Sequence, residues 1–199
     1  MLLIYCRDPL VRGQPDAAFA SEVGAAERLG LPYALINFEA LIYDGDASRA
    51  VRAIPAASQT AIGMFRGWML RPEQYAQLYA ALLDRGVRLI NDPAAYRHCH
   101  YLPESYERIA SWTPRTVWLP LASADDMPSR DALRMLLAPF GDRPLIVKDY
   151  VKSRKHEWLE ACFIPSATDL EGVERVVRRF LELQGDDLAG GLVFREYVA

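Results

Sequence analysis

Cysteine is scarce in this sequence. Three cysteines occur among 199 residues, at positions 6, 99 and 162, and no CxxC pair is present. An odd number of widely spaced cysteines argues against the disulfide framework of small secreted domains, and it offers no paired ligands for structural zinc. We therefore expect a reduced protein with a cytoplasmic location.

The sequence also lacks long apolar runs and an excess of basic residues. No segment approaches the length of a transmembrane helix, and the charges and proline of residues 7–9 come too early for a signal peptide. The net charge of −3 argues against a general role at nucleic acids or membrane surfaces, because both attract basic proteins. The content of 51% hydrophobic and 25% charged residues predicts a globular protein with a sizeable core.

Several widespread catalytic motifs are missing. The chain contains no GxGxxG, no GxxxxGK, no GxSxG and no HExxH, which removes the common phosphate-loop and hydrolase interpretations. His98-Cys99-His100 is spaced too tightly for the usual structural zinc patterns. We therefore predict no metal site within this sequence.

Alternating strand and helix patterns predict an α/β fold in two parts. The first part, residues 1–115, alternates short apolar runs with amphipathic stretches, which favours a parallel sheet. Its expected strands are 2–6, 33–38, 61–65 and 87–90. The second part, residues 116–199, has an α+β pattern with expected strands at 113–120, which crosses the boundary, 145–151, 157–164 and 192–198. The expected hairpin between the second and third of these strands has its tip at residues 152–156.

Lys148 is the most informative candidate site residue. It follows Leu145-Ile146-Val147 on a strand that should be mostly buried, where an unpaired ammonium group is costly. Asp149 lies on the opposite face of that strand, so the natural partner is another carboxylate or a bound phosphate. A lysine at the strand edge that extends to water is the alternative. The adjacent basic loop, with Ser153, Arg154 and Lys155, favours phosphate because lysine and arginine suit phosphate oxygens.

Two further clusters extend this hypothesis. The final strand carries Arg195 and Glu196, and a glutamate there could accept a hydrogen bond from an amino group such as that of adenine. An alternating edge strand explains the same pattern without a ligand. Arg66 follows the strand at 61–65, and ligands of open α/β sheets bind just beyond the carboxyl ends of strands. A surface arginine at the start of a helix is the alternative there.

Taken together, these segments resemble the ATP-grasp superfamily, and most closely the third family of the clade named for two arginines and one lysine. The resemblance implies a pre-ATP-grasp α/β domain over 1–115, followed by the first subdomain of an ATP-grasp fold over 116–199. The segments that carry it are FRGWMLRPEQYAQLYAAL (65–82), RLINDP (88–93), PLIVKDYVKSRKHEW (144–158) and LVFREYV (192–198).

The resemblance also implies roles for individual residues. Lys148 corresponds to the lysine that contacts the phosphates of ATP, and loop 152–156, with Ser153, Arg154 and Lys155, corresponds to a flap over them. Glu196 corresponds to a glutamate near adenine, and Val198 offers backbone contacts to the base. Arg66 and Arg195 are the candidates for the two catalytic arginines.

The implied reaction is the ATP-dependent ligation of a carboxylate to an amine or a similar nucleophile through an acylphosphate. The resemblance implies Mg²⁺ as well, with its ligands in a C-terminal subdomain. We expect that subdomain to be missing beyond Ala199, and the chain to be inactive alone. Two alternatives stay open: a non-catalytic nucleotide- or metabolite-binding module, and a structural domain that forms oligomers through an exposed final strand.

Overall fold

A computed structural model describes residues 1–56 and 59–198 of the chain. It divides into two compact units, residues 1–97 and 98–199, each with its own sheet. The expected α/β class, with a parallel sheet followed by an α+β part, is confirmed. Within the described residues, no helix combines the length and the apolar character needed to cross a membrane.

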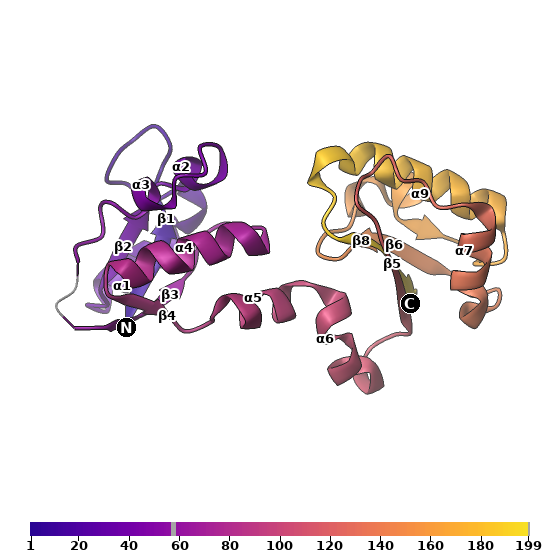
Figure 1. Ribbon diagram of the computed structural model, residues 1–199, viewed down its shortest axis with the longest axis horizontal. Coiled ribbons are helices and arrows are strands. Elements are labelled where there is room, and N and C mark those ends of the chain that lie inside the picture. Colours follow the sequence, from indigo (N-terminus) through magenta and orange to yellow (C-terminus); the bar gives the residue numbers. More distant parts are fainter. Residues whose placement is uncertain (57–58, 199) are drawn as a thin grey trace. The chain divides into compact units, whose positions relative to one another are not determined.

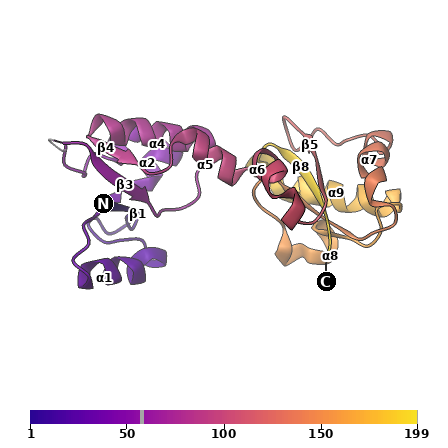
Figure 2. The same ribbon diagram turned by 90° about the horizontal axis from the view of Figure 1, so that it is seen from below.

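The first unit is built on a four-stranded parallel sheet with the strand order β2-β1-β3-β4. Figure 2 shows α1 on one face of this sheet and α4 on the other. The core on the α4 side includes Ile4, Ile36 and Leu78, which are fully buried. The elements are β1 (Leu2–Cys6), η1 (Ala17–Phe19), α1 (Ala20–Arg28), β2 (Tyr33–Ile36), α2 (Phe38–Ile42), α3 (Ala47–Ala50), β3 (Ala61–Phe65), α4 (Pro72–Asp84), β4 (Val87–Leu89) and α5 (Pro93–His100).

The second unit has a four-stranded antiparallel sheet with the order β5-β8-β6-β7. Helices α7 and α9 pack against one of its faces (Figure 1), where Phe180, Phe194 and Leu133 are buried in a common core. The elements are α6 (Leu102–Ile109), η2 (Ala110–Trp112), β5 (Thr116–Pro120), α7 (Arg130–Leu137), η3 (Ala138–Phe140), β6 (Leu145–Asp149), η4 (Lys155–Glu157), α8 (Trp158–Ala161), β7 (Phe163–Ile164), α9 (Leu170–Gln184), η5 (Gly185–Asp187) and β8 (Gly191–Glu196).

The structure places residues 98–115 in the second unit, whereas the sequence suggested a boundary at 115/116. These residues belong to the second unit because α6 is hydrogen-bonded to it. The backbone N–H of Leu102 donates to the carbonyl of Tyr150 over 3.1 Å, and the hydroxyl of Tyr106 accepts from the N–H of Thr116 over 3.0 Å. These bonds attach α6 to the antiparallel sheet.

Two sequence-based expectations about the second unit are wrong. Residues 157–164 do not form one strand, because α8 precedes the two-residue strand β7, so residues 152–156 are not the tip of a hairpin. The final strand β8 is not an exposed edge, because it pairs with β5 on one side and β6 on the other. The proposed oligomer through an exposed final strand therefore loses its structural basis.

Candidate functional site

Strand β6 separates two chemically different faces. Leu145, Val147 and Asp149 are buried toward the helices, whereas Ile146 and Lys148 alternate with them on the opposite face and are only partly buried. Lys148 lies directly opposite Val193 of β8. The predicted phosphate-binding lysine is thus on the sheet face opposite α7 and α9, where Tyr106 of α6 packs on Trp118 of β5.

The ammonium group of Lys148 is held by its own chain. Its Nζ donates a hydrogen bond to the carbonyl oxygen of Val151 over 2.9 Å. Burial lowers the pKa of Lys148 from its ordinary value, and the positive charge of Arg195 lowers it further, while the negative potentials of Asp149 and Cys162 oppose the shift. An anion that bound Lys148 would offset this desolvation cost, which makes the position suited to a phosphate or carboxylate ligand.

Asp149 fixes the turn on which Lys148 depends, a role that the sequence analysis missed. Its carboxylate is fully buried and accepts four N–H groups. Two come from the backbone of Val151 and Lys152, and one comes from the side chain of Gln184 over 2.7 Å; the fourth, from the Ala189 backbone, spans 3.3 Å. Because Val151 is also the acceptor for Lys148, Asp149 holds the lysine in place from the other face of the strand.

Arg195 shares the face of Lys148. In the antiparallel register, Arg195 lies opposite Ile146, two pairs along from Lys148 and Val193, so the side chains of these residues point to the same side. Its guanidinium donates to the hydroxyl of Thr113. Of the predicted residues, the structure therefore brings Lys148 and Arg195 together.

The predicted loop residues fall into two groups. Ser153 and Lys155 are exposed. Arg154 is partly buried, and its guanidinium donates to the side-chain oxygen of Gln184 over 2.8 Å and to the carbonyl of Leu183. Arg154 therefore attaches the loop to the end of α9 and satisfies one of the terminal carbonyl groups of that helix. Its guanidinium is committed to the protein rather than turned toward a ligand.

Glu196 and Val198 are placed apart from Lys148. Glu196 lies opposite Leu145, on the core-facing side of β8, and its carboxylate forms an ion pair with Arg143 over 3.0 Å. Val198 follows the strand and is 68% exposed. The side chain of Glu196 is thus directed away from the Lys148 face, and the backbone N–H groups of Glu196 and Tyr197 donate to the carbonyls of Arg115 and Pro144, each over 2.9 Å.

An aromatic cluster continues the Lys148 face, and the sequence analysis missed it as a site feature. Phe163 of β7 lies opposite Ile146, and its ring stacks on Trp158 with a centroid distance of 5.5 Å. The ring of Tyr197 packs edge-on against both, at 5.2 Å from Phe163 and 5.7 Å from Trp158. The sequence predicted one strand over residues 157–164, whereas Trp158 belongs to the helix α8 and Phe163 to the strand β7. The stacking of these two rings was therefore not predicted.

His100 is a further residue near this face. Burial lowers the pKa of its imidazole, and the positive charges of Lys152 and Lys148 lower it further, while Asp149 opposes them. Its position at the end of α5 places it within electrostatic range of Lys148. The His98-Cys99-His100 sequence was interpreted only as a possible metal motif. It carries no pattern that predicts the proximity of His100 to Lys148.

Arg66 belongs to the first unit. It follows β3, and its guanidinium forms a two-pronged pair with Glu22 of α1, with N–O distances of 2.8 and 3.1 Å. The hydrogen bonds and charge of Glu22 raise the pKa of Arg66. The side chain is half exposed, so a ligand could compete for it at low cost.

Possible metal ligands do not gather in this structure. Among residues 1–56 and 59–198, no group of three or more histidine, cysteine, aspartate or glutamate side chains is arranged to hold a metal ion. Magnesium prefers several oxygen ligands. The described residues therefore do not fit a magnesium site, and none of them is assigned to one.

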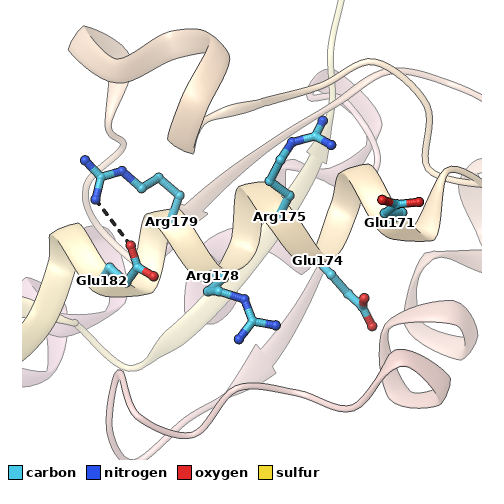
Figure 3. A pocket seen from close by; sticks show the side chains of 6 residues that line it. All are labelled: Glu171, Glu174, Arg175, Arg178, Arg179 and Glu182. Carbon is cyan, nitrogen blue, oxygen red and sulfur yellow. Dashed lines mark hydrogen bonds and ion pairs between the residues drawn. The ribbon is translucent and has the colours of Figure 1, made fainter.

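A surface depression of about 370 Å³ lies along α9. Figure 3 shows three arginine side chains along the helix there, between acidic side chains on either end. Arg179 and Glu182 are paired at 3.2 Å. Glu174 is paired with Arg130 of α7. Acidic and basic side chains that pair at helical spacing are typical of a solvated helix face, so this depression is not a candidate active site. It is lined by Glu171, Glu174, Arg175, Arg178, Arg179 and Glu182.

The lowered pKa of Lys148 predicts a specific pH dependence of the free energy of unfolding. Because its folded pKa lies below the unfolded value of about 10.4, the unfolded chain holds more protons between the two values, so the contribution of Lys148 to stability rises with pH in that alkaline window. We expect Lys148→Met to be more stable than wild type at neutral pH, and this advantage to shrink as pH rises through the window. Urea unfolding at a series of pH values measures it. An identical pH response in Lys148→Met and in the exposed control Lys155→Met would contradict the assignment.

Comparison with known proteins supports an ATP-grasp assignment. Residues 139–199 match the ATP-grasp domain of family 3 in the clade named for two arginines and one lysine. This segment contains β6, α8, α9 and β8, and therefore Lys148, Arg195 and Glu196. No curated protein sequence matches the chain.

Solved structures extend the likeness to the whole fold. D-cycloserine synthetase DcsG is similar with a TM-score of 0.57 and 18% identity, over 100% of this chain and 60% of that one. D-alanyl-alanine synthetase A from Vibrio cholerae has a TM-score of 0.52 and 10% identity, over 100% and 59%. The ATP-grasp ligase PsnB, solved with a minimal precursor, Mg and ADP, has a TM-score of 0.50 and 16% identity, over 100% and 65%.

The chain spans about three fifths of the length of these structures. Residues 139–199 thus carry the sequence pattern of an ATP-grasp domain, and the described chain has the fold of ATP-grasp ligases over that part of their length.

Proposed function

We propose that this chain is the ATP-binding part of an ATP-dependent ligase that joins a carboxylate to an amine or a similar nucleophile. The observation that carries the proposal is Lys148, a partly buried lysine that shares with Arg195 the face of the second sheet opposite α7 and α9, within the segment that matches the ATP-grasp family. The similarity of the fold to several ATP-grasp ligases supports the same conclusion.

The residues of this face suit a nucleotide in two ways. Lys148 and Arg195 supply positive charge for phosphate oxygens, and the exposed loop residues Ser153 and Lys155 can add donors. The rings of Trp158 and Phe163 offer an apolar, flat surface on which an adenine base could pack. When bound, ATP would supply the phosphoryl group that activates the carboxylate.

The structure leads us to propose different roles for Arg154 and Glu196 from those predicted from the sequence, and to keep the predicted role of Arg66. Arg154 has a structural role in holding the loop, because its donors already bind Gln184 and Leu183. For adenine, we propose the backbone of Val198 as the binding element, since the Glu196 carboxylate is paired with Arg143 and the N–H groups of Glu196 and Tyr197 are bonded to other carbonyls. Arg66 is proposed as a second catalytic arginine on the strength of its place after β3 alone.

The proposal also includes the use of Mg²⁺ and a cytoplasmic location of the protein. We infer that Mg²⁺ accompanies ATP, as it accompanies ADP in the PsnB structure, without assigning it ligands among the described residues. The three free cysteines, Cys6, Cys99 and Cys162, support a reducing, cytoplasmic environment.

The proposal is tested by calorimetric titration of the chain with ATP and Mg²⁺. We expect the wild type to bind and Lys148→Ala to bind about 10- to 100-fold more weakly, since a charge-assisted hydrogen bond contributes about 1.5–3 kcal/mol. Arg134→Ala, which removes an exposed positive charge from α7, is the matched control and should leave binding unchanged.

Each outcome has a definite meaning. Equal binding by Lys148→Ala and wild type would remove Lys148 from the phosphate site. No binding by the wild type would contradict an ATP site formed by this chain. Binding without ATP turnover, when a panel of carboxylates and amines is supplied, would favour a non-catalytic nucleotide-binding module.

A further inference from the structure

The carboxyl end of β1 is the point where the strand order of the first unit reverses. β2 pairs with one side of β1 and β3 pairs with the other, and all these pairings are parallel. The chain leaving β1 goes first to β2 and returns, by way of α2 and α3, to β3 on the far side. Such switch points open a crevice in which open α/β sheets bind small ligands.

Arg7 lies at this point with an unsatisfied donor. Its backbone N–H donates to the carbonyl of Ile36 over 3.0 Å, which places it beside the end of β2. The Nε atom of its guanidinium is buried, and no described group accepts a hydrogen bond from it. A buried charged donor without an acceptor is costly, and buried polar groups in native proteins normally have a partner.

Glu39 carries the complementary unsatisfied group. It lies in the first turn of α2, directly after β2, and its Oε2 atom is buried without a donor among the described residues. Burial raises the pKa of the Cys6 thiol at the end of β1 to about 12, and the negative charge of Glu39 contributes to that shift. The carboxylate of Glu39 is therefore within electrostatic range of the residue that precedes Arg7.

The two loops that flank the carboxyl end of β1 are ordered and carry exposed apolar side chains. Asp8 accepts the N–H groups of Leu10 and Val11 at 2.8 Å, and the indole N–H of Trp68 donates to Asp16 over 3.0 Å. The apolar side chains are 91% exposed at Leu10, 46% at Val11, 44% at Trp68 and 55% at Met69. Apolar side chains exposed on loops beside a strand end can contact the apolar part of a small ligand.

We propose that the carboxyl end of β1 binds a small zwitterion, a molecule with one carboxylate and one ammonium group such as a free amino acid. Arg7 takes the carboxylate and Glu39 takes the ammonium group. A simple anion would leave Glu39 unsatisfied, and a simple cation would leave Arg7 unsatisfied. This site uses residues of the first unit only. A failure of this proposal would therefore not contradict the nucleotide site at Lys148, and a failure of the nucleotide site would not contradict this proposal.

The test is a calorimetric titration of the full chain, without ATP, with glycine and with both enantiomers of each of the other nineteen protein amino acids. For any amino acid that binds, the matching 2-hydroxy acid and the matching amine without the carboxylate are titrated next. We expect both analogues to bind about 10- to 100-fold more weakly, because each loses one charge-assisted contact.

Three variants assign the contacts. Arg7→Gln and Glu39→Gln are each expected to weaken binding by the same 10- to 100-fold, whereas Arg12→Gln, which removes an exposed arginine from the same loop, should leave it unchanged. Circular dichroism, together with ATP binding at Lys148 where the wild type shows it, establishes that each variant is folded. The proposal is overturned if no amino acid binds, if the hydroxy acid or the amine binds as well as the amino acid, or if binding survives in both Arg7→Gln and Glu39→Gln.

Discussion

Replacing Asp149 with alanine is expected to lower the free energy of unfolding of the second unit by about 3–5 kcal/mol. The change removes a fully buried carboxylate and leaves four N–H donors, including one from Gln184, without their acceptor. The turn at 150–152 then loses its anchor. Urea unfolding followed by tryptophan fluorescence measures the loss, because Trp118 and Trp158 lie in this unit.

Two comparisons make the Asp149 prediction specific. Asp142→Ala removes an exposed aspartate from the same unit and should change the free energy of unfolding by less than about 0.5 kcal/mol. Asp149→Asn keeps the size and one acceptor oxygen, so its cost should lie between those of Asp142→Ala and Asp149→Ala. If Asp149→Ala costs no more than Asp142→Ala, the carboxylate is not the anchor that its hydrogen bonds indicate.

Replacing Gly191 with alanine is expected to be comparably damaging, by about 3–5 kcal/mol. Gly191 begins β8 with a φ of +140°, and a Cβ there would lie 2.2 Å from the carbonyl oxygen of Leu119 and 2.7 Å from the nitrogen of Leu121. Both atoms belong to the backbone at the end of β5, so they cannot move aside as a flexible side chain would. We expect β5 and β8 to separate at this end, with a lower midpoint of urea unfolding.

Gly185→Ala is the matched control for Gly191→Ala. Gly185 also has a positive φ, of +48°, but a Cβ there would meet nothing within 4 Å. Its substitution should therefore cost only the backbone strain, about 1–3 kcal/mol. Equal losses for the two variants would show that the close approach of β5 and β8 has no energetic consequence.

The order of strands and helices was largely predictable from the sequence because it depends on local patterns. The apolar run of β1 and the amphipathic helix α4, opened by Pro72, each carry their signal within a few residues. The segment 157–164 was misassigned because it contains a short helix and a short strand in succession, with apolar residues in both. The helix α8 has only four residues, which is too short to show the 3.6-residue periodicity by which a helix is predicted.

The candidate site was predictable to the extent that it follows from the alternation of a strand. Lys148 stood out because a charge on a buried strand needs a partner, and Asp149 was expected on the other face, as the structure has it. The anchoring of Arg154 on Gln184 and the pairing of Glu196 with Arg143 join residues far apart in the sequence. Such tertiary contacts leave no local pattern, so the sequence could not show that these two side chains were engaged.

The pairing of β5 with β8 bears on how the protein is made. These strands are the first and last of the second unit, and β8 must insert between β5 and β6 to complete the sheet. During synthesis on the ribosome, the strands of the first unit can assemble as soon as β4 emerges, whereas β5 and β6 must wait for β8 with their inner edges unpaired. Slow folding, and a need for chaperones in this interval, are the expected consequences of such a long-range pairing.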